Sequence, residues 1–457
     1  KYSKKMKLLS LFFILFPVVV ECLSEKLVDI WPLPQKVMAQ QDCQSWAAVD
    51  ANSFQIKILT VNEKVLDNAV NRTLSRLFTD KINDLDPYRN NIHNTHSRPW
   101  PTIPCTDKPL YWLKELTIDV AKPNTPLTFD VDSQYFLDID ASKAHIRSNT
   151  VWGALHGLQS FEQLVIWSDV NELPKKQRQF VIANVPIKIH DFPRFKWRGL
   201  MIDCSRHYQP MYELKKTIDA MEMVKMNVLH WHLSDAESFP YVSKSFPELS
   251  EKGAYSPKAT YSASNVSAII EYAHDRGVVV IPEIDVPGHT GAMVNAHPEI
   301  VAQCWDYLES RYGVPKGELP WPSWDALALD LSSPHTVPLI EQLYDDVIAD
   351  FPFDHVHLGG DEVVGGCWAS LPQMRQWMSA NGMSAPDHGG ALPSGWVRPL
   401  HHDGKIYDFA AAQLKFEVEL VDYVTKKKRT AVLWEEAFIL FCFSAIIAKR
   451  CCGSCMD

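Results

Sequence analysis

The sequence predicts a parallel barrel of the (β/α)8 type, preceded by a small α+β domain. From Asp191 onward the pattern becomes strand, loop and helix in repetition, which indicates a parallel sheet. The polar motifs of this part stand where apolar strands end, and in a (β/α)8 barrel the catalytic groups sit at that face. With 457 residues, the chain is long enough for one barrel and a smaller domain.

The first domain is predicted over residues 26–190 and mixes strands with one clear helix. Alternating apolar residues predict strands that run through Phe54–Ile58, Leu116–Val120 and Tyr135–Ile139. Apolar residues then repeat at helical spacing from Val151 to Val165, after an Asn149-Thr150 cap.

The barrel is predicted over residues 191–438. Its strand candidates number five, where a closed barrel needs eight, so we expect an incomplete barrel. These strands are Trp197–Asp203, Asn227–Leu233, Val278–Ile284, His355–Leu358 and Ala431–Trp434. The helices that follow them are expected at about 212–226, 264–276, 335–350, 372–380 and 409–427.

The two ends of the chain differ from the predicted domains. Residues 1–22 have the layout of a secretory signal peptide, because a lysine cluster precedes a short apolar run. The sequons that begin at Asn71 and Asn265 fit the same compartment. We therefore expect a secretory-pathway protein that is lysosomal or extracellular. Residues 439–457 form an apolar, cysteine-rich tail, and its apolar run over residues 439–448 is about half the length of a membrane span.

Charge and cysteine content limit the partners. The net charge of −10 argues against nucleic acid or an anionic membrane as a partner. Ten cysteines in a secreted chain invite disulfide pairing. Cys204 lies at the end of a predicted strand, so we expect it to be a free, buried thiol.

Adjacent acids, Asp361 and Glu362, are the most informative feature of the chain. They follow the apolar strand that starts at His355, after Gly359 and Gly360, which allow a sharp turn and the close approach of a ligand. In a dry environment two such acids would not both ionise easily, which favours one protonated and one charged carboxyl group. This pair predicts acid–base chemistry on a substrate at the carboxyl end of the sheet.

The motifs taken together resemble glycoside hydrolase family 20, the β-N-acetylhexosaminidases, over roughly residues 28–438. They are the segments Trp31–Gln35, Trp152–Leu158, Arg198–His207, His230–Pro240, Glu283–His289, His357–Glu362 and Trp434–Glu436. The resemblance implies hydrolysis of terminal, non-reducing N-acetylhexosamine residues from β-linked glycosides, with no cofactor and no metal. It is compatible with a homodimer.

The resemblance also implies a role for each residue of the site. In this substrate-assisted mechanism the acetamido oxygen of the sugar attacks the anomeric carbon. Glu362 would be the general acid and later the base, while Asp361 would orient the acetamido group. Asp235 and His289 would complete a relay to the acid. Substrate contacts are expected from Arg198, Asp285 and Trp434.

Two disulfides are implied by the same resemblance. Cys304 would pair with Cys367 near the acid pair, and Cys43 would pair with Cys105 in the first domain. The chain departs from the family at Ala236, where a second Asp is common, and in the segment Trp434–Glu436, where Gln is common.

Two other interpretations stay open at this point. The spacing of His230-x-His232 and of His355-x-His357 places pairs of histidines on one strand face, as in metal-dependent barrel hydrolases. Alternatively, because the resemblance ends after Phe438, the chain is a truncated relative that is catalytically impaired and at most binds sugar. We expect weak activity on that interpretation.

Overall fold

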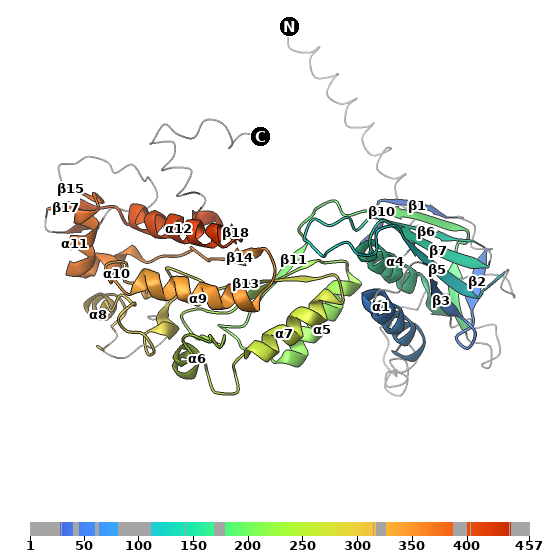
Figure 1. Cartoon of the computed structure of the whole chain (residues 1–457), viewed down its shortest axis with the longest axis horizontal. Coiled ribbons are helices and arrows are strands. Elements are labelled where there is room, and N and C mark those ends of the chain that lie inside the picture. The colour runs from blue at the N-terminus through green and yellow to red at the C-terminus, as the bar shows by residue number, and fades with distance from the viewer. Residues whose placement is uncertain are drawn as a thin grey trace, which may run out of the picture. The chain divides into compact units, whose positions relative to one another are not determined.

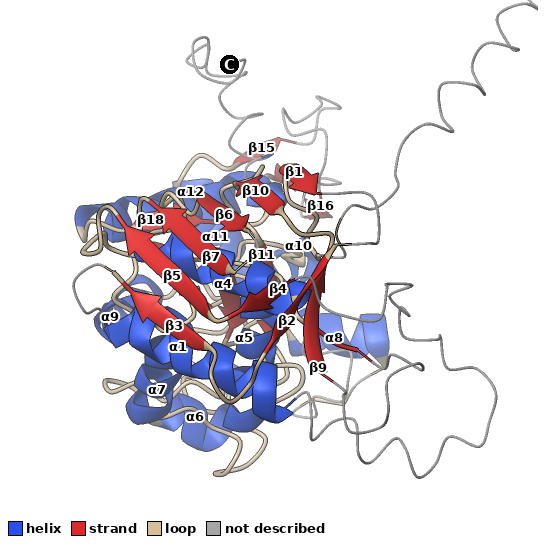
Figure 2. Cartoon of the chain, turned by 90° about the vertical axis from the view of Figure 1, so that its right-hand side faces the viewer, coloured by secondary structure: helices blue, strands red, loops and turns tan. Residues whose placement is uncertain are grey.

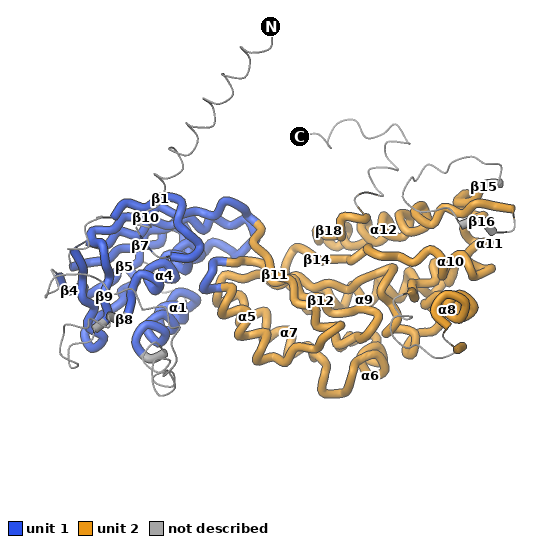
Figure 3. The backbone as a smooth tube through the Cα atoms, turned by 180° about the vertical axis from the view of Figure 1, so that it is seen from behind, with its two compact units in different colours: residues 1–196, 222–225 blue, residues 197–221, 226–457 orange. Residues whose placement is uncertain are grey.

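The computed structural model describes residues 28, 30–39, 45–59, 64–80, 111–140, 142–168, 179–313, 315–316, 326–386, 400–402, 404–437 and 439. The chain divides into two compact units (Figure 3). Unit 1 comprises residues 1–196 together with 222–225, and unit 2 comprises residues 197–221 and 226–457.

Unit 1 is an α+β domain built on a six-stranded mixed sheet (Figure 2). In spatial order its strands are β1 (Lys36–Ala39), β10 (Ile187–Asp191), β6 (Tyr135–Ile139), β7 (Lys143–Ser148), β5 (Glu115–Val120) and β3 (Gln55–Ile58). Helix α4 (Val151–Leu164) packs on this sheet and against α1 (Lys64–Ser75), which continues into η1 (Arg76–Asp80). A second sheet contains β4 (Tyr111–Leu113), β2 (Trp46–Val49), β9 (Gln179–Ala183) and β8 (Ile166–Ser168).

The predicted elements of unit 1 are present, and several others were missed. Thr150 caps α4 as expected, because its hydroxyl oxygen accepts a hydrogen bond from the Gly153 N–H at 3.2 Å. Helix α1 and the strands β1, β2, β4 and β7–β10 were not predicted from the sequence.

Unit 2 contains the parallel sheet that the repeated strand–helix pattern predicts (Figure 1). Among the described residues it has five strands, which are β11 (Gly199–Asp203), β12 (Val228–His232), β13 (Val279–Glu283), β14 (His355–His357) and β18 (Thr430–Val432). Their spatial order equals their order along the chain. A doubly wound sheet would reverse direction at a switch point, so this order is that of a barrel.

One helix layer connects these strands. The connecting helices are α5 (Met211–Met223), α7 (Ala263–His274), α9 (Thr336–Asp350) and α12 (Phe409–Lys426). Helix α9 packs against α7 and against α12, while α7 contacts β13 and α12 contacts β18. Ser262 and Asn265 form a capping box that fixes the start of α7.

Shorter helices and strands lie within the loops of unit 2. They are α6 (Glu248–Gly253), η3 (Gly291–Met293), α8 (Trp305–Tyr312), α10 (Gly365–Ser370), α11 (Pro372–Ala380) and the small antiparallel sheet of β15 (Ser384–Pro386), β17 (Lys405–Tyr407) and β16 (Leu400–His402). A disulfide joins Cys304, before α8, to Cys367 in α10, as expected. Cys204 is buried and unpaired, also as expected.

Several sequence-based predictions fall on parts of the chain that the structure does not describe. They concern the signal peptide over residues 1–22, the Cys43–Cys105 disulfide and residues 440–457 of the tail. No helix in the described ranges combines the length and apolarity that crossing a membrane would require.

Candidate active site

The structure brings most of the predicted site residues to the carboxyl ends of the parallel strands. Asp235 follows β12, and both Asp285 and His289 follow β13. The acid pair follows β14, and Trp434 follows β18. Because parallel strands end at one edge of the sheet, these loops meet there.

The backbone of Arg198 does not lie at this end of the sheet. It immediately precedes β11, and its N–H donates a hydrogen bond to Oδ1 of Asn227 at 2.9 Å. Its main chain is therefore at the opposite end of β11 from Asp203, and its role in sugar binding stays a prediction.

The turn after β14 has an unusual backbone. Gly359, Gly360 and Glu362 adopt φ values of 75°, 96° and 50°, in the left-handed region that residues with a side chain rarely adopt. A non-glycine residue with positive φ is an observation that favours a functional site. This geometry turns Glu362 sharply away from the strand direction.

Neighbouring elements hold this turn through hydrogen bonds. The Gly359 carbonyl accepts from the Trp434 N–H at 3.0 Å, and the Gly360 N–H donates to Oδ1 of Asp285 at 3.1 Å. The Glu362 N–H donates to Oε2 of Glu436 at 2.6 Å. The strands β13 and β18 thus both fix the backbone that carries the acid pair.

Asp285 packs directly on this turn. A Cβ atom built on Gly359 would lie 1.7 Å from Oδ1 of Asp285, so only glycine fits at this position. Asp285 is 1% exposed, and burial raises the pKa of its carboxyl group well above the usual value. Its carboxyl group therefore supports the turn, and its expected contact with substrate stays a prediction.

His289 lies between the relay carboxylate and the acid pair. Its Nδ1 atom is 3.1 Å from Oδ1 of Asp235. Its Nε2 atom, which is buried without a hydrogen-bond partner, lies 3.9 Å from Oδ1 of Asp361 and 3.7 Å from Oε2 of Glu362. Burial would lower the pKa of His289, but the hydrogen bond to Asp235 and the nearby carboxyl groups raise it to about 9. His289 is therefore a cation beside the acid pair at neutral pH.

The two acids of the pair have different surroundings. The Asp361 side chain is 25% exposed, whereas the Glu362 side chain is 70% exposed. Within the described residues Glu362 thus lacks the dry environment that the sequence analysis expected for it.

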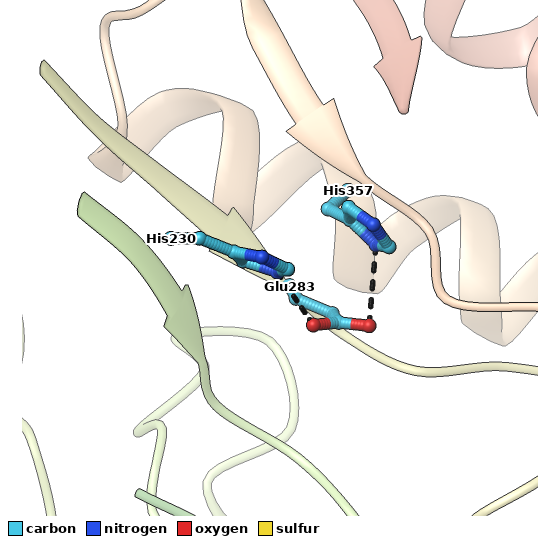
Figure 4. Close-up of side chains that lie close together, drawn as sticks. All are labelled: His230, Glu283 and His357. Carbon is cyan, nitrogen blue, oxygen red and sulfur yellow. Dashed lines mark hydrogen bonds and ion pairs between the residues drawn. The ribbon is translucent and has the colours of Figure 1, made fainter. Parts of the chain in front are cut away.

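Glu283 is a buried anion that the sequence analysis did not identify as important (Figure 4). Its Oε2 atom lies 2.6 Å from both Nε2 of His230 and Nδ1 of His232. Its Oε1 atom lies 3.2 Å from Nδ1 of His357 and accepts the Trp434 indole N–H at 2.9 Å. Burial would raise the pKa of Glu283, but the hydrogen bonds from the histidines hold it well below the usual value.

His232 links this cluster to the relay. Its second ring nitrogen, Nε2, lies 2.7 Å from Oδ2 of Asp235. Burial opposes a charge on His232, but its hydrogen bonds to Asp235 and Glu283 raise its pKa well above the usual value. Alternating carboxylates and imidazoles thus form one continuous chain from Glu283 through His232 and Asp235 to His289.

Arg206 is a further cation at the site, and no role was predicted for it from the sequence. Its guanidinium group lies 2.9 Å from Asp203 and 2.9 Å from Asp235, and 3.7 Å from Glu237. It therefore shares Asp235 with His232 and His289, and it neutralises the acids at the ends of β11 and β12.

A sequence signal existed for Glu283, since an acid inside the apolar run Val278–Ile284 needs a buried partner.

The histidine pairs bear on the metal interpretation. His230, Glu283 and His357 are one of several described groups whose spacing would permit a metal ion. The contacts of 2.6 Å from Glu283 to His230 and His232 are hydrogen-bond distances, so direct bonds already satisfy this carboxylate. His355 instead packs its ring against Trp197.

Comparison with known proteins then assigns the family. The model of the glycosyl hydrolase family 20 catalytic domain matches residues 195–444, and a model described as "beta-acetyl hexosaminidase like" matches residues 30–164. The chain belongs to glycosyl hydrolase family 20. The catalytic-domain match runs past Phe438, where the resemblance was expected to end, because it includes the largely apolar residues up to 444.

Relatives of this family 20 chain carry hexosaminidase names. It is 36% identical over 272 residues to "Beta-hexosaminidase subunit A1" of Dictyostelium discoideum, covering 60% of this chain and 47% of that protein. It is 30% identical over 412 residues to "Beta-hexosaminidase subunit beta" of Rattus norvegicus, covering 90% of this chain and 66% of that protein. The chain thus spans about half to two thirds of the length of these relatives.

A solved structure agrees in fold. The chitobiase of Flavobacterium johnsoniae superposes with a TM-score of 0.66 at 27% sequence identity, covering 91% of this chain and 53% of that one. The barrel-type sheet with a preceding α+β domain is therefore the fold of the family.

Proposed function

We propose that this chain hydrolyses terminal, non-reducing N-acetylhexosamine residues from β-linked N-acetylhexosaminides by substrate-assisted, retaining catalysis. One observation carries the proposal: the Asp361–Glu362 pair stands on a strained glycine turn beside a cationic His289 that is bound to Asp235. The names of the relatives, which are hexosaminidases and a chitobiase, support the substrate class.

In the first step Glu362 donates its proton to the glycosidic oxygen while the acetamido oxygen attacks the anomeric carbon. The glycosidic bond breaks, the alcohol leaves, and an oxazolinium ion forms. Asp361, as a carboxylate, accepts the acetamido N–H and stabilises the positive charge that develops on the ring. In the second step Glu362 removes a proton from water, which attacks the anomeric carbon and opens the oxazolinium ring.

The residues around the pair supply charge and position. His289 lies 3.7 Å from Glu362 and 3.9 Å from Asp361, so it places a positive charge next to both acids of the pair. Trp434, whose indole N–H is held by Glu283, presents a fixed aromatic ring at the end of β18. Aromatic rings of this kind suit the apolar faces of sugars.

The proposal is tested by comparing two nitrophenyl glycosides that differ at one group. The β-N-acetylglucosaminide should be hydrolysed and the β-glucoside, which has no acetamido oxygen, should not. A thiazoline mimic of the oxazolinium ion should inhibit the reaction competitively. Equal turnover of both glycosides would contradict the mechanism.

The metal interpretation predicts a different outcome for the same assay. Because Glu283 is already satisfied by hydrogen bonds to histidine, we expect turnover to persist after dialysis against a chelator. Loss of turnover that a divalent metal restores would favour a metal-dependent hydrolase instead.

We further propose that the chain enters the secretory pathway and acts in a lysosome or outside the cell, and that it forms a homodimer. The apolar run within residues 1–22 and the exposed sequon residue Asn71 support the first proposal. Glycosidase-sensitive mass on Asn71 would test the compartment, and light scattering of the purified chain would test the dimer.

A further inference from the structure

The turn that carries the acid pair rests on two polar side chains of α12. The Gln413 amide donates hydrogen bonds to the carbonyl oxygen of Gly360 at 2.9 Å and to Oε1 of Glu417 at 2.7 Å. Glu417 is 1% exposed, and its Oε2 atom is buried without a hydrogen-bond partner. Glu417 is therefore a buried acid that takes no part in the proposed reaction.

Glu417 also lies close to the side of the turn where a side chain on Gly360 would stand. A Cβ atom built on Gly360 would lie 3.1 Å from Oε1 of Glu417 and 3.5 Å from side-chain atoms of Leu433 and Ala437. The carboxyl group therefore lies near Gly360 and among apolar groups. Because Gln413 binds both Glu417 and the Gly360 carbonyl, a displacement of the Glu417 carboxyl group would reach Gly360 and the two residues that follow.

The charged groups on the elements around Glu417 are mainly acids. Glu436, after β18, binds the Glu362 N–H, and the turn itself adds Asp361 and Glu362. Burial raises the pKa of Glu417 to about 7, the Gln413 hydrogen bond opposes this rise, and the charge of Glu436 adds to it. The nearby lysines have other partners: Lys415 pairs with Glu419 on α12, and Lys427 pairs with Asp345 of α9.

We propose that Gln413 and Glu417 form a latch beneath the catalytic turn, in which Glu417 is a positioning residue that keeps the Asp361–Glu362 pair in place only while its carboxyl group is neutral. A neutral carboxyl group tolerates an unpartnered oxygen in an apolar site far better than a carboxylate does. An ionised Glu417 gains hydration only by opening the packing between α12 and Gly360. The consequence for catalysis rests on the function proposed above, whereas the consequence for stability does not.

The sign of the stability effect follows from the direction of the pKa shift. Because folding raises the pKa of Glu417 from 4.5 to about 7, its neutral form is favoured in the folded state. The fold therefore loses stability as the pH rises from about 4.5 to about 7. Glu417→Gln, which is neutral at every pH, should melt with wild type at about pH 4.5 and several degrees higher at about pH 8.

A matched control is available on the same helix. Glu419 pairs with Lys415, and its side chain is 46% exposed, so Glu419→Gln makes the same charge change at the surface of α12. This variant should follow the wild-type melting temperature at both pH values. If Glu417→Gln melts with wild type at about pH 8, or below it, the latch is wrong.

Kinetics test the positioning role in the full chain. The ratio of kcat at about pH 7.5 to kcat at about pH 5 should rise roughly threefold or more in Glu417→Gln and stay unchanged in Glu419→Gln, with the effect in kcat and not in KM. Equal ratios for the two variants would overturn the positioning role. If the chain hydrolyses no glycoside, the proposed function fails, but the melting experiment still decides whether the latch exists.

Discussion

At the scale of single residues, the adjacent acids have separate tasks because their environments differ. Asp361 is largely covered and has one oxygen without a hydrogen-bond partner, whereas Glu362 projects outward on a left-handed backbone. A residue that must exchange a proton with an alcohol and then with water benefits from this access. A residue that must hold one acetamido group benefits from cover.

The effect on turnover of substituting the general acid, Glu362, should depend on the leaving group. Glu362→Gln removes the proton donor, so turnover of a poor leaving group such as a sugar should fall by at least ~100-fold. A nitrophenolate needs little protonation, so the first step for this substrate should suffer less. Steady-state kinetics on a chitooligosaccharide and on a nitrophenyl glycoside would measure the difference. An equal loss on both substrates would argue against the acid assignment.

The effect on turnover of substituting the neighbouring acid, Asp361, should not depend on the leaving group. Asp361→Asn keeps the size of the side chain but loses the charge that holds the acetamido N–H and stabilises the ring cation. We expect a fall of about 100-fold or more on both substrates. Wild-type rates for Asp361→Asn on N-acetylated substrates would show that the mechanism assigned to this site is wrong.

At the scale of elements, the site depends on how β13, β18 and α12 hold one turn. Asp285, the Trp434 N–H and Gln413 bind consecutive peptide groups of Gly359 and Gly360. These hydrogen bonds attach the turn to the rigid ends of the sheet, so the position of the acid pair is fixed. It also explains why the loop can keep backbone angles that are unfavourable in isolation.

A glycine substitution separates backbone strain from steric overlap. Gly359 and Gly382 have nearly equal φ values of 75° and 73°, but a Cβ atom would overlap Asp285 at Gly359 and meet nothing at Gly382. Gly382→Ala should therefore cost about 1–2 kcal/mol of stability, which is the strain alone, and should leave turnover intact. Gly359→Ala should cost clearly more and abolish turnover. Denaturant unfolding and kinetics of both variants would test this, and equal effects would contradict it.

The disulfide should stabilise two loops at this end of the sheet. Cys304 and Cys367 are 63 residues apart, and one follows the His289 loop while the other follows the acid pair. Loop closure of this size contributes about 3–4 kcal/mol in the chain-entropy view. The double variant Cys304→Ser/Cys367→Ser should lose about this much unfolding free energy in denaturant. Peptide mapping without reductant that found both thiols free would contradict the pairing.

At the scale of the molecule, two features could be predicted from the sequence. They are the elements with strong hydrophobic periodicity and the positions where the parallel strands end. All five parallel strands and the expected helices of unit 2 lie within a few residues of their predicted bounds, because apolar strands and helix caps are local signals. The strand β2 was missed, since its partners β4 and β9 lie far along the chain. The strand β7 was missed although it pairs with the neighbouring strand β6. The contacts of Gln413 depend on tertiary packing, so no local pattern could identify them. For Glu283 a local signal existed, an acid inside an apolar run, but its histidine partners are set by tertiary packing.

The buried charges of unit 2 predict how its stability varies with pH. Glu283 and Asp235 have pKa values held below their usual range, so the stability that they contribute is present above about pH 4.5 and is lost as the pH falls. Glu417 acts in the opposite direction, because its raised pKa of about 7 removes stability as the pH rises from about 4.5 to about 7. His289, with a pKa of about 9, contributes stability below about pH 6.5 that is lost as the pH rises through 9.

These effects together predict a stability maximum at mildly acidic pH. The melting temperature of the unit 2 transition should be highest near about pH 5 and should fall on both sides. The buried Trp231 and Trp368 report this transition by fluorescence, so a melting series from about pH 3 to about pH 9 would measure it. A maximum at about pH 8 or above would contradict the combined effect of Glu417 and His289. A maximum near pH 5 would suit a hydrolase that works in an acidic compartment, and so would favour the lysosome over the extracellular space among the two proposed destinations.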